Sequence, residues 1–525
     1  MTEYLTIKKA SYWASKYLKK NITSSNISYL IQYGRIKKYR KNGTISINKN
    51  DLINYYKNFN GQRENNWKEK LGKDLNWELS FDHLKERDTT KHVHRLHPYK
   101  GKYIPQLVQY FLDNHTDNFK KETYFKQGDI VLDPFSGSGT TMIQANELGI
   151  HAIGIDISAF NTLIANVKVE KVNYLDLHNE ITRITNLLKE FIYKLNNTQF
   201  EKELLHELNI FNKKYFPSPE FKIKVRKKEI NEKTYAKKKE EEFLLTFSKL
   251  KEKYKLKIKQ NTNNNFLEKW YLQPVKNEID FVFEQLKDVK NPTTKKVLSI
   301  ILSRTIRSCR ATTHADLGTL KEPITQTYFC RKHGKICKPL FSILSWWERY
   351  GKDTIKRFFE FNRLRTNTHQ KCLQGDARNI DIFLELKEKN EKFAELIKNK
   401  KIKGIFSSPP YIGLINYHEQ HAYAYDLFGF ERNDNSEIGP LFKGQGKEAR
   451  NSYIKGVSQV LINSKRFLQD AYDIFLVSND KYNMYPTIAE KAGMQIVNQY
   501  KRPVLNRTEK NKSAYAEIIF HLKAK

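Results

Sequence analysis

Two short motifs, far apart in the sequence, carry residue types that could build one active site. Residues 133–141 read DPFSGSGTT, and residues 407–411 read SSPPY. In the first motif an apolar strand breaks into a glycine turn, where the backbone can approach a nucleotide-like ligand because Gly137 and Gly139 carry no Cβ. In the second, two prolines stiffen a turn that ends in a tyrosine, and such a ring can stack on a planar base. The two motifs therefore predict a site that holds a nucleotide-like cofactor and a base.

The sequence on either side of the glycine turn extends the cofactor site. DIVLDPF predicts a strand, TMIQANEL predicts a helix that begins at the turn, and HAIGIDIS predicts a second strand that ends at Asp156. A carboxylate at the end of that strand can accept hydrogen bonds from both hydroxyls of a ribose. A dinucleotide oxidoreductase would use the same features, but this turn lacks the third glycine that favours close packing of a pyrophosphate.

The whole string DPFSGSGTT is more specific than its glycines, and it is similar to the S-adenosylmethionine-binding motif of amino-methyltransferases. The resemblance implies S-adenosylmethionine as cofactor, with Asp133 near its methionine amino group and Asp376, in QGDARNI, near its adenine. A turn or cap aspartate is the other interpretation of Asp376. HRLHPYKGKYIPQ resembles the segment that packs over the methionine end of the cofactor in this family. The expected cofactor residues are Asp133, Phe135, Gly137, Gly139, Thr140, Asp156, Asp376, His97 and Tyr103.

The SSPPY turn suits methyl transfer to an exocyclic amine. The lone pair of such an amine is delocalised into the base, so a catalyst must hold the nitrogen close to the methyl group and accept hydrogen bonds from its hydrogens. Ser408 offers a hydroxyl, Pro409 and Pro410 leave their carbonyls free, and Tyr411 provides a face for stacking. In isolation the string could be a Pro-rich recognition turn. Its position directly after the apolar strand KGIF favours catalysis, and base flipping is then implied because a duplex hides the target amine.

With both motifs, the chain resembles the S-adenosylmethionine-dependent DNA amino-methyltransferases of restriction-modification systems. Within that family SPPY is typical of enzymes that methylate cytosine at N4, whereas DPPY and NPPY are commoner for adenine at N6. The resemblance implies methylation of cytosine N4 in double-stranded DNA, with adenine N6 as the alternative, and a cognate restriction endonuclease as partner. A DNA-binding regulator with a degenerate core is a further alternative, which the intact motifs disfavour. The recognition sequence and the oligomeric state stay open.

The elements that must position these motifs form an alternating pattern. Strands that alternate with helices predict a doubly wound α/β sheet of the Rossmann-like methyltransferase type, interrupted by a long helical insertion. We expect a helix-turn-helix module at residues 1–60, the cofactor half of the core at 81–170, the insertion at 171–370 and the catalytic half at 371–525. The insertion is the favoured target-recognition region, and residues 428–464 are the other candidate.

Residues 1–60 predict a small basic unit. Two helical patterns, ASYWASKYL and ITSSNISYLIQYG, precede RIKKYRKNGTISI, which reads as a basic hairpin with a tight turn at Asn42 and Gly43. The arrangement resembles the winged helix-turn-helix of excisionase-like and MerR-like DNA-binding modules; a basic packing domain is the alternative. The resemblance implies DNA contacts from Arg35, Lys37, Lys38 and Arg40.

The composition favours a polyanionic partner. Lys and Arg exceed Asp and Glu by 93 − 58 = 35, although a Lys-rich proteome would also produce such a charge. No apolar run approaches the ~20 residues that cross a bilayer, and the N-terminus lacks an apolar signal core, so we expect a cytoplasmic protein. The four cysteines are too few for a disulfide scaffold. CRKHGKIC offers Cys330, His333 and Cys337 as metal ligands, but a fourth ligand is not evident, and no metal is predicted.

Overall fold

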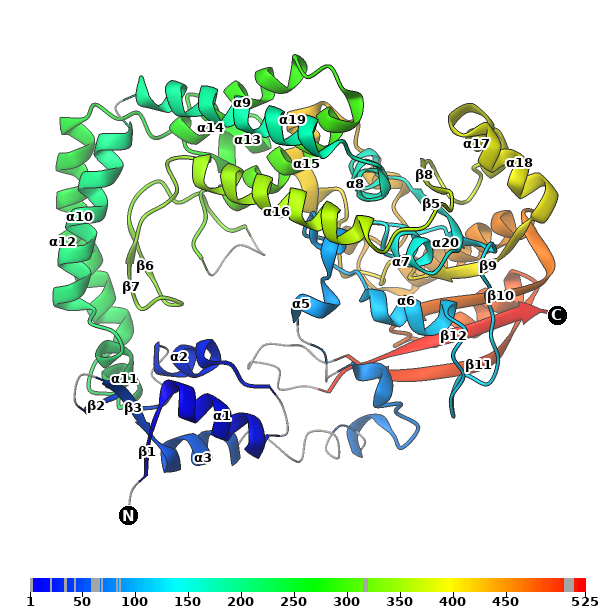
Figure 1. The fold of residues 1–525 in the computed structure, drawn as a ribbon, viewed down its shortest axis with the longest axis horizontal. Helices are drawn as coiled ribbons and strands as arrows, with labels where there is room; N and C mark the ends of the chain where they lie inside the picture. Colours follow the sequence, from blue (N-terminus) through cyan, green and yellow to red (C-terminus); the bar gives the residue numbers. More distant parts are fainter. Residues whose placement is uncertain are drawn as a thin grey trace. The chain divides into compact units, whose positions relative to one another are not determined.

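A seven-stranded sheet, whose strands lie between residues 130 and 524, forms the core of the computed structural model (Figure 1). Its strands are β4 Ile130–Asp133, β5 His151–Asp156, β8 Gln370–Gln374, β9 Ile402–Ser407, β10 Leu468–Ser478, β11 Met494–Pro503 and β12 Ala516–Ala524. Their order in the sheet is β11-β12-β10-β9-β4-β5-β8. The strands β8, β5, β4, β9 and β10 are parallel to one another. Strand β12 lies between β10 and β11 and runs antiparallel to both. The predicted Rossmann-like methyltransferase sheet is therefore confirmed.

The structure describes residues 3–18, 21–32, 35–41, 44–57, 67, 69–81, 84, 86–195, 197–314, 320–504 and 514–525. Within these ranges no helix has both the length and the apolar character needed to cross a membrane.

Helices cover both faces of this sheet because successive strand residues point to opposite sides. Ile130 and Leu132 of β4 belong to one buried cluster, which also takes residues from α17 Ile382–Lys389, α18 Glu391–Lys400, α20 Lys447–Lys465 and α21 Tyr485–Lys491. Val131, between them, belongs to a second cluster with residues of α6 Pro105–Leu112, α7 Thr140–Glu147 and α8 Ala159–Val169. Nearly continuous apolar strands such as β4 are the expected consequence of burial on two faces.

The order of strands reverses between β4 and β9. From β4 the chain continues to β5 and β8 on one side, and from β9 it continues to β10 on the other, while β4 and β9 themselves pair through Val131↔Gly404 and Leu132↔Ile405. A reversal of this kind leaves a crevice at the carboxyl ends of the two parallel strands. Asp133 ends β4 and Ser407 ends β9. Both sequence motifs therefore begin at this crevice.

The chain between β5 and β8 is mainly helical and also contains a short hairpin. Its helices after α8 are α9 Tyr174–Tyr193, α10 Asn197–Tyr215, α11 Glu220–Arg226, α12 Glu232–Lys253, α13 Phe266–Trp270, α14 Gln273–Lys287, α15 Pro292–Ser308 and α16 Leu344–Asn362. The hairpin consists of β6 Tyr328–Cys330 and β7 Lys335–Cys337. Shorter segments elsewhere are α5 Glu86–Thr89, α19 Ala422–Phe428, and the 3-10 turns η1 Glu78–Ser80, η2 His92–Arg95, η3 Glu419–His421, η4 Asp434–Ser436 and η5 Leu441–Lys443.

The N-terminal segment has its own sheet and core. Its elements are β1 Tyr4–Thr6, α1 Ile7–Tyr17, α2 Ser24–Gln32, β2 Tyr39–Lys41, β3 Thr44–Asn48 and α3 Lys49–Lys57, with sheet order β1-β3-β2. Ile27, Ile47 and Leu52 are buried in its core. The Thr23 hydroxyl accepts a hydrogen bond from the backbone N–H of Asn26 at 3.2 Å, as an N-terminal cap does. The expected turn at Asn42 and Gly43 lies outside the described residues.

The chain divides into two compact units. One comprises Met1–Asn66, Thr185–Val282 and Ile306–Trp346, and the other comprises Trp67–Ile184, Phe283–Thr305 and Trp347–Lys525. The second unit contains the whole seven-stranded sheet. The domain boundaries expected at residues 60, 170 and 370 stay a prediction.

Candidate active site

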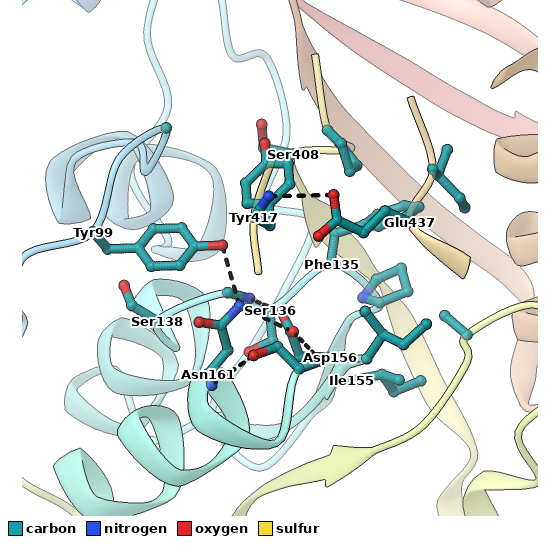
Figure 2. Close-up of a pocket in the computed structure, with 18 of the residues that line it drawn as sticks. Tyr99, Phe135, Ser136, Ser138, Ile155, Asp156, Asn161, Ser408, Tyr417 and Glu437 are labelled. Carbon is teal, nitrogen blue, oxygen red and sulfur yellow. Dashed lines mark hydrogen bonds between the residues drawn. The ribbon is translucent and has the colours of Figure 1, made fainter. Parts of the chain in front are cut away.

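A cavity lies at the crevice between β4 and β9 and opens to solvent (Figure 2). Residues from both sequence motifs contribute to its wall, together with the loop before α6, the end of β5, the turn after β8 and η4. The expected site residues that line it are Tyr103, Phe135, Gly137, Thr140, Asp156, Asp376, Ser408 and Pro410. The structure thus brings together side chains that are hundreds of residues apart in the sequence.

The glycine turn after β4 has a backbone that only glycine tolerates well. Gly137 has φ +50°, and a Cβ placed there would lie 2.9 Å from the hydroxyl oxygen of Tyr99. Gly139 has φ +77°, and its Cβ would lie 3.0 Å from Cβ of Ala165 on α8. Both values are below normal contact distances, and positive φ adds strain for other residues. The turn therefore needs glycine at two points: Gly137 lines the cavity, and Gly139 lets α7 pack closely against α8.

Asp156 at the end of β5 is held in place by three hydrogen bonds. Its Oδ2 accepts from the backbone N–H of Gly137 at 2.8 Å, and its Oδ1 accepts from the N–H of Ser158 at 2.9 Å and from Nδ2 of Asn161 at 3.1 Å. Burial raises the pKa of Asp156 to about 6, although these hydrogen bonds oppose the shift. Figure 2 shows this carboxylate beside the glycine turn. The contact locks the orientation of the only acidic side chain at this end of β5.

Asp133 is placed differently from Asp156. Its side chain is buried and does not line the cavity. The carboxylate accepts hydrogen bonds from the hydroxyl of Tyr103 at 3.0 Å and from the hydroxyl of Ser407 at 2.5 Å. Burial raises the pKa of Asp133, and hydrogen bonds from Ser407, Thr141 and Tyr103 counteract that effect. Asp133 therefore ties β4 to the end of β9, and its expected contact with a cofactor amino group stays a prediction.

The SSPPY turn follows β9 directly. Ser408 and Pro410 line the cavity, whereas Pro409 and Tyr411 do not. Tyr411 is half-buried, and its hydroxyl donates a hydrogen bond of 2.5 Å to Oε1 of Glu517 on β12. Burial raises the pKa of the Tyr411 hydroxyl, so it stays protonated and able to donate. The aromatic end of the turn is thereby anchored to the sheet, beside the cavity wall rather than in it.

The remaining expected cofactor residues divide into one that reaches the cavity and one that does not. Asp376 lines it, and its carboxylate accepts hydrogen bonds of 2.9 Å from Nε of Arg378 to both oxygens. Burial of Asp376 is outweighed by these bonds, which lower its pKa. His97 is fully buried outside the lining, and its Nδ1 donates to the carbonyl of Pro98 at 3.0 Å. His97 has the contacts of a residue that supports the loop before α6.

Sequence reasoning missed several residues that line the cavity. Tyr99 lies between the expected residues of the loop before α6, and its hydroxyl accepts from Nδ2 of Asn161 at 3.5 Å. Its ring is stacked near Tyr417, with centroids 6.3 Å apart. The buried Glu437 accepts hydrogen bonds from the backbone N–H groups of Tyr417 and His418 at 3.2 and 2.8 Å. These residues come from loops without a motif; only the aromatic spacing in HPYKGKY signalled Tyr99.

The expected DNA-binding residues lie in the other unit. Arg35 and Lys37 are exposed, and Lys38 is partly exposed. Lys37 Nζ lies 5.4 Å from the centre of the Tyr39 ring. The backbone of Arg40 belongs to β2. Their contact with DNA stays a prediction.

The cavity combines groups that suit a nucleoside-like ligand next to a polar reaction site. The Asp156 carboxylate can accept hydrogen bonds from a diol, and Phe135, Ile155 and Ile438 provide apolar surface for a planar ring. The hydroxyl of Ser408 lies in the same wall. A ligand that fills the nucleoside part of the cavity would therefore face the SSPPY turn.

Comparisons with known proteins find relatives among the DNA methyltransferases. The family model for N6/N4 DNA methylases matches residues 5–167. Type II methyltransferase M.MjaII of Methanocaldococcus jannaschii is 49% identical over 522 residues, which cover 99% of this chain and 96% of that protein. Type II methyltransferase M.BsoBI of Geobacillus stearothermophilus is 33% identical over 22% of this chain and 20% of its own length. For Type II methyltransferase M.MvaI of Kocuria varians the identity is 29% over 25% and 29%.

Proposed function

Since this chain belongs to the DNA amino-methyltransferases of the type II restriction-modification class, we propose that it methylates the exocyclic N4 amine of cytosine. Membership establishes a DNA methyltransferase of the N4 or N6 type with S-adenosylmethionine as methyl donor. The choice of cytosine goes beyond that membership. The alternative within the same class is the N6 amine of adenine.

The observation that carries the proposal is the position of Ser408. It belongs to an SPPY string, which is the form typical of N4-cytosine enzymes, and it lines the same cavity as Gly137 and Asp156. The pairing of β4 with β9 supports this arrangement, because it sets the ends of the two motifs side by side. The hydrogen bond from Ser407 to Asp133 fixes the register between them. The cofactor turn and the SPPY turn therefore act as one site.

The cofactor fits the residues of the glycine turn. S-adenosylmethionine, when bound, supplies an electrophilic methyl group on a positively charged sulfur. Asp156 would accept hydrogen bonds from its ribose hydroxyls, and Phe135 would pack on its adenine, with Asp376 at the adenine edge. A side chain at Gly137 would collide with Tyr99, which also lines the cavity, and would displace the wall that the ligand contacts. Tyr103 and Thr140 would close the methionine end.

Ser408 and Pro410 would act on the target amine. The Ser408 hydroxyl and the Pro410 carbonyl accept hydrogen bonds from the two N–H groups, which favours a pyramidal nitrogen with an available lone pair. S-adenosylmethionine would supply the methyl group to this nitrogen, and the nitrogen would release one of its two protons. The target base has to leave the duplex to reach this wall, and Tyr411 would support the extruded ring.

DNA is the substrate of this class, and we further propose that residues 1–60 contribute affinity for the duplex. The exposed Arg35 and Lys37 beside the β2–β3 hairpin are suited to phosphate contacts. A cognate restriction endonuclease that cleaves the same unmethylated sequence would be the functional partner.

The decisive experiment identifies the methylated base. Purified protein, unmethylated DNA and S-adenosylmethionine carrying a labelled methyl group would be incubated, and the DNA digested to nucleosides for liquid chromatography with mass spectrometry. We expect label in N4-methylcytosine, and roughly 100-fold slower labelling with the Ser408→Ala protein at the same concentration. Label in N6-methyladenine would reject the choice of base while leaving the family intact. Absence of label from DNA with several unrelated sequences would argue against the proposed reaction.

A further inference from the structure

Four metal-binding side chains converge at the β6–β7 hairpin, which belongs to the unit without the seven-stranded sheet. His314, Cys330, His333 and Cys337 each present one ligand atom, and these four atoms all lie within 4.8 Å of one another. Sγ of Cys337 is 3.5 Å from Nδ1 of His333, and the rings of His314 and His333 have centroids 4.3 Å apart. Both cysteines are buried and neither forms a disulfide. No reaction proposed for this chain uses any of these residues.

The hairpin holds three of the four ligands in a tight turn. Gly334, with φ +64°, turns the chain between β6 and β7, and its N–H donates to the carbonyl of Cys330 at 2.6 Å. Cys330 precedes that turn and His333 lies within it, while Cys337 ends β7. A cysteine binds a metal through its thiolate sulfur.

The fourth ligand, His314, comes from a separate loop after α15. The hydroxyl of Tyr328 lies 2.8 Å from its Nδ1 and accepts its backbone N–H at 3.2 Å. A hydrogen bond that fixes one ring nitrogen orients the other nitrogen of a histidine for metal binding. The packing of the hairpin is also fixed from outside, because Asn212 of α10 exchanges two hydrogen bonds of 2.9 Å with the backbone of Ile336. The ligands are therefore held by neighbours that do not bind the metal.

We propose that His314, Cys330, His333 and Cys337 bind one zinc ion. Two thiolates and two imidazoles form a tetrahedral zinc set, in which ligand atoms stand about 3.3–3.8 Å apart. The observed separations need only small adjustments to close to that size. A cluster of two irons, which also uses two cysteines and two histidines, would require the ligand pairs to stand farther apart on separate irons.

The zinc has a structural role in this proposal. Four protein ligands leave no open coordination position, so the ion would have no site for water or substrate. Its effect is to join the hairpin to the loop that carries His314. The buried cluster described at this point is small, with Tyr328, Cys330 and Cys337 and with Ile324 packed against them. The exposed Arg331 and Lys332 of the turn would then be carried on a rigid support.

The test measures metal in the full-length protein. Protein purified under reducing conditions and freed of loose metal would be analysed by plasma mass spectrometry, and we expect about one zinc ion per chain. After exchange with Co²⁺, we expect the visible absorption of a tetrahedral site and a band from thiolate-to-cobalt charge transfer. Wild-type protein without zinc, protein that holds iron instead, or a Cys330–Cys337 disulfide found by mass spectrometry would each overturn the proposal.

Variants assign the ligands. Cys330→Ser and Cys337→Ser should each reduce retained zinc to less than about one tenth and abolish the charge-transfer band. His314→Asn and His333→Asn should weaken retention. Cys309→Ser is the matched control, because Cys309 is also buried in the same unit but outside the cluster, and it should retain the metal. Unchanged zinc content in both cysteine variants would contradict the assignment even if wild-type protein contains zinc.

Discussion

At the scale of single residues, the site separates side chains that touch the cavity from side chains that hold them. Ser408 and Asp156 line the cavity, whereas Asp133 and His97 are buried beside it. Tyr411 lies between these cases, because its hydroxyl is bound to Glu517 while its ring stays partly exposed. Substitutions of residues that line the cavity should therefore change turnover or ligand affinity directly. Substitutions of the buried residues should act through the position of their neighbours.

Ser408→Ala should lower turnover by roughly 100-fold, with little effect on cofactor or DNA affinity. The reason is that the hydroxyl accepts a hydrogen bond that matters most when the amine becomes pyramidal. Ser408→Asn is the matched variant, because an amide oxygen can replace the acceptor. Single-turnover methylation and calorimetric binding would measure the two effects. Equal turnover of the alanine variant and the wild type would place the catalytic acceptor elsewhere.

Tyr411→Phe and Tyr411→Ala distinguish the ring from the hydroxyl. The phenylalanine variant loses the bond to Glu517 but keeps a stacking face, so we expect it to retain most of its turnover. The alanine variant loses roughly 1–3 kcal/mol of base stacking and should hold the flipped base poorly. A fluorescent base analogue at the target position would report extrusion. If the phenylalanine variant lost as much turnover as the alanine variant, the hydrogen bond to Glu517 rather than the stacking face would be the contribution of Tyr411.

Cofactor affinity should depend on pH through Asp156. Its pKa of about 6 in the free protein means that the carboxylate is ionised at pH 7.5 and becomes protonated below 6, where it loses an acceptor for the ribose. We expect affinity to fall about tenfold between pH 7 and pH 5. The pKa of Asp156 is higher in the folded chain than in the unfolded chain. Asp156 should therefore increase the free energy of unfolding of the cofactor-free protein as the pH falls.

Calorimetry across this pH range, with Asp156→Asn as control, checks the assignment. The asparagine variant should bind the cofactor more weakly than the wild type at pH 7.5 and show a flatter pH profile. A wild-type profile identical to that of the variant would mean that Asp156 does not contact the ribose.

At the scale of elements, the turn between β4 and α7 explains why so short a motif is so informative. Two features exclude side chains at Gly137 and Gly139: their positive φ and the close approach of Tyr99 and Ala165. Few other sequences can therefore form this turn. The strands β4 and β9 were predictable for a related reason, because each ends at one of the two motifs. The pairing of β4 with β9 could not be predicted, because the local sequence of a strand does not specify which strand becomes its neighbour.

Gly137→Ala should weaken cofactor binding by about tenfold or more, since its Cβ would meet Tyr99 and the residue would be strained at φ +50°. Gly446→Ala is the matched control, because no atom lies within 4 Å of a Cβ built there. Calorimetric affinity and thermal melting would be measured for both. Equal cofactor affinity in the two variants would remove the turn from the binding site.

Sequence reasoning failed where the structure depends on short or irregular elements. The strands β6 and β7 have three residues each and carry no alternating pattern. His314 lies 330 − 314 = 16 residues before Cys330, a spacing set by the loop rather than by a regular element. Tyr99 and Glu437 likewise reach the cavity from loops. Their positions follow from tertiary packing, which one sequence does not display.

At the scale of the whole molecule, the charge of +35 supports interaction with a polyanion, and DNA is the substrate of this family. The charge is spread over the whole chain, so its excess alone does not say which surface meets DNA. The proposed DNA-binding surface lies on the N-terminal module, where Arg35 and Lys37, just before β2, are exposed.

Replacing Arg35, Lys37 and Lys38 together with glutamine should weaken DNA binding at low salt and reduce the salt dependence by about 0.9 in logarithmic slope for each lost phosphate contact. A control with the same charge change replaces the exposed Lys387, Lys392 and Lys398 of α17 and α18. Fluorescence anisotropy at several salt concentrations would compare the two. Equal slopes would assign the module a role other than phosphate contact, and turnover at saturating DNA should stay unchanged.

The neighbouring positions of β4 and β9 also bear on how the protein is made. Val131 pairs with Gly404, which is 404 − 131 = 273 residues later in the chain. On the ribosome, β4 and β5 are complete long before β9 exists, so one edge of β4 waits with unpaired backbone groups. The intervening helices rely on nearer contacts and can form during that interval. Synthesis of the last quarter of the chain is therefore the step at which the sheet closes, and an exposed strand edge before it is a natural point of attachment for a chaperone.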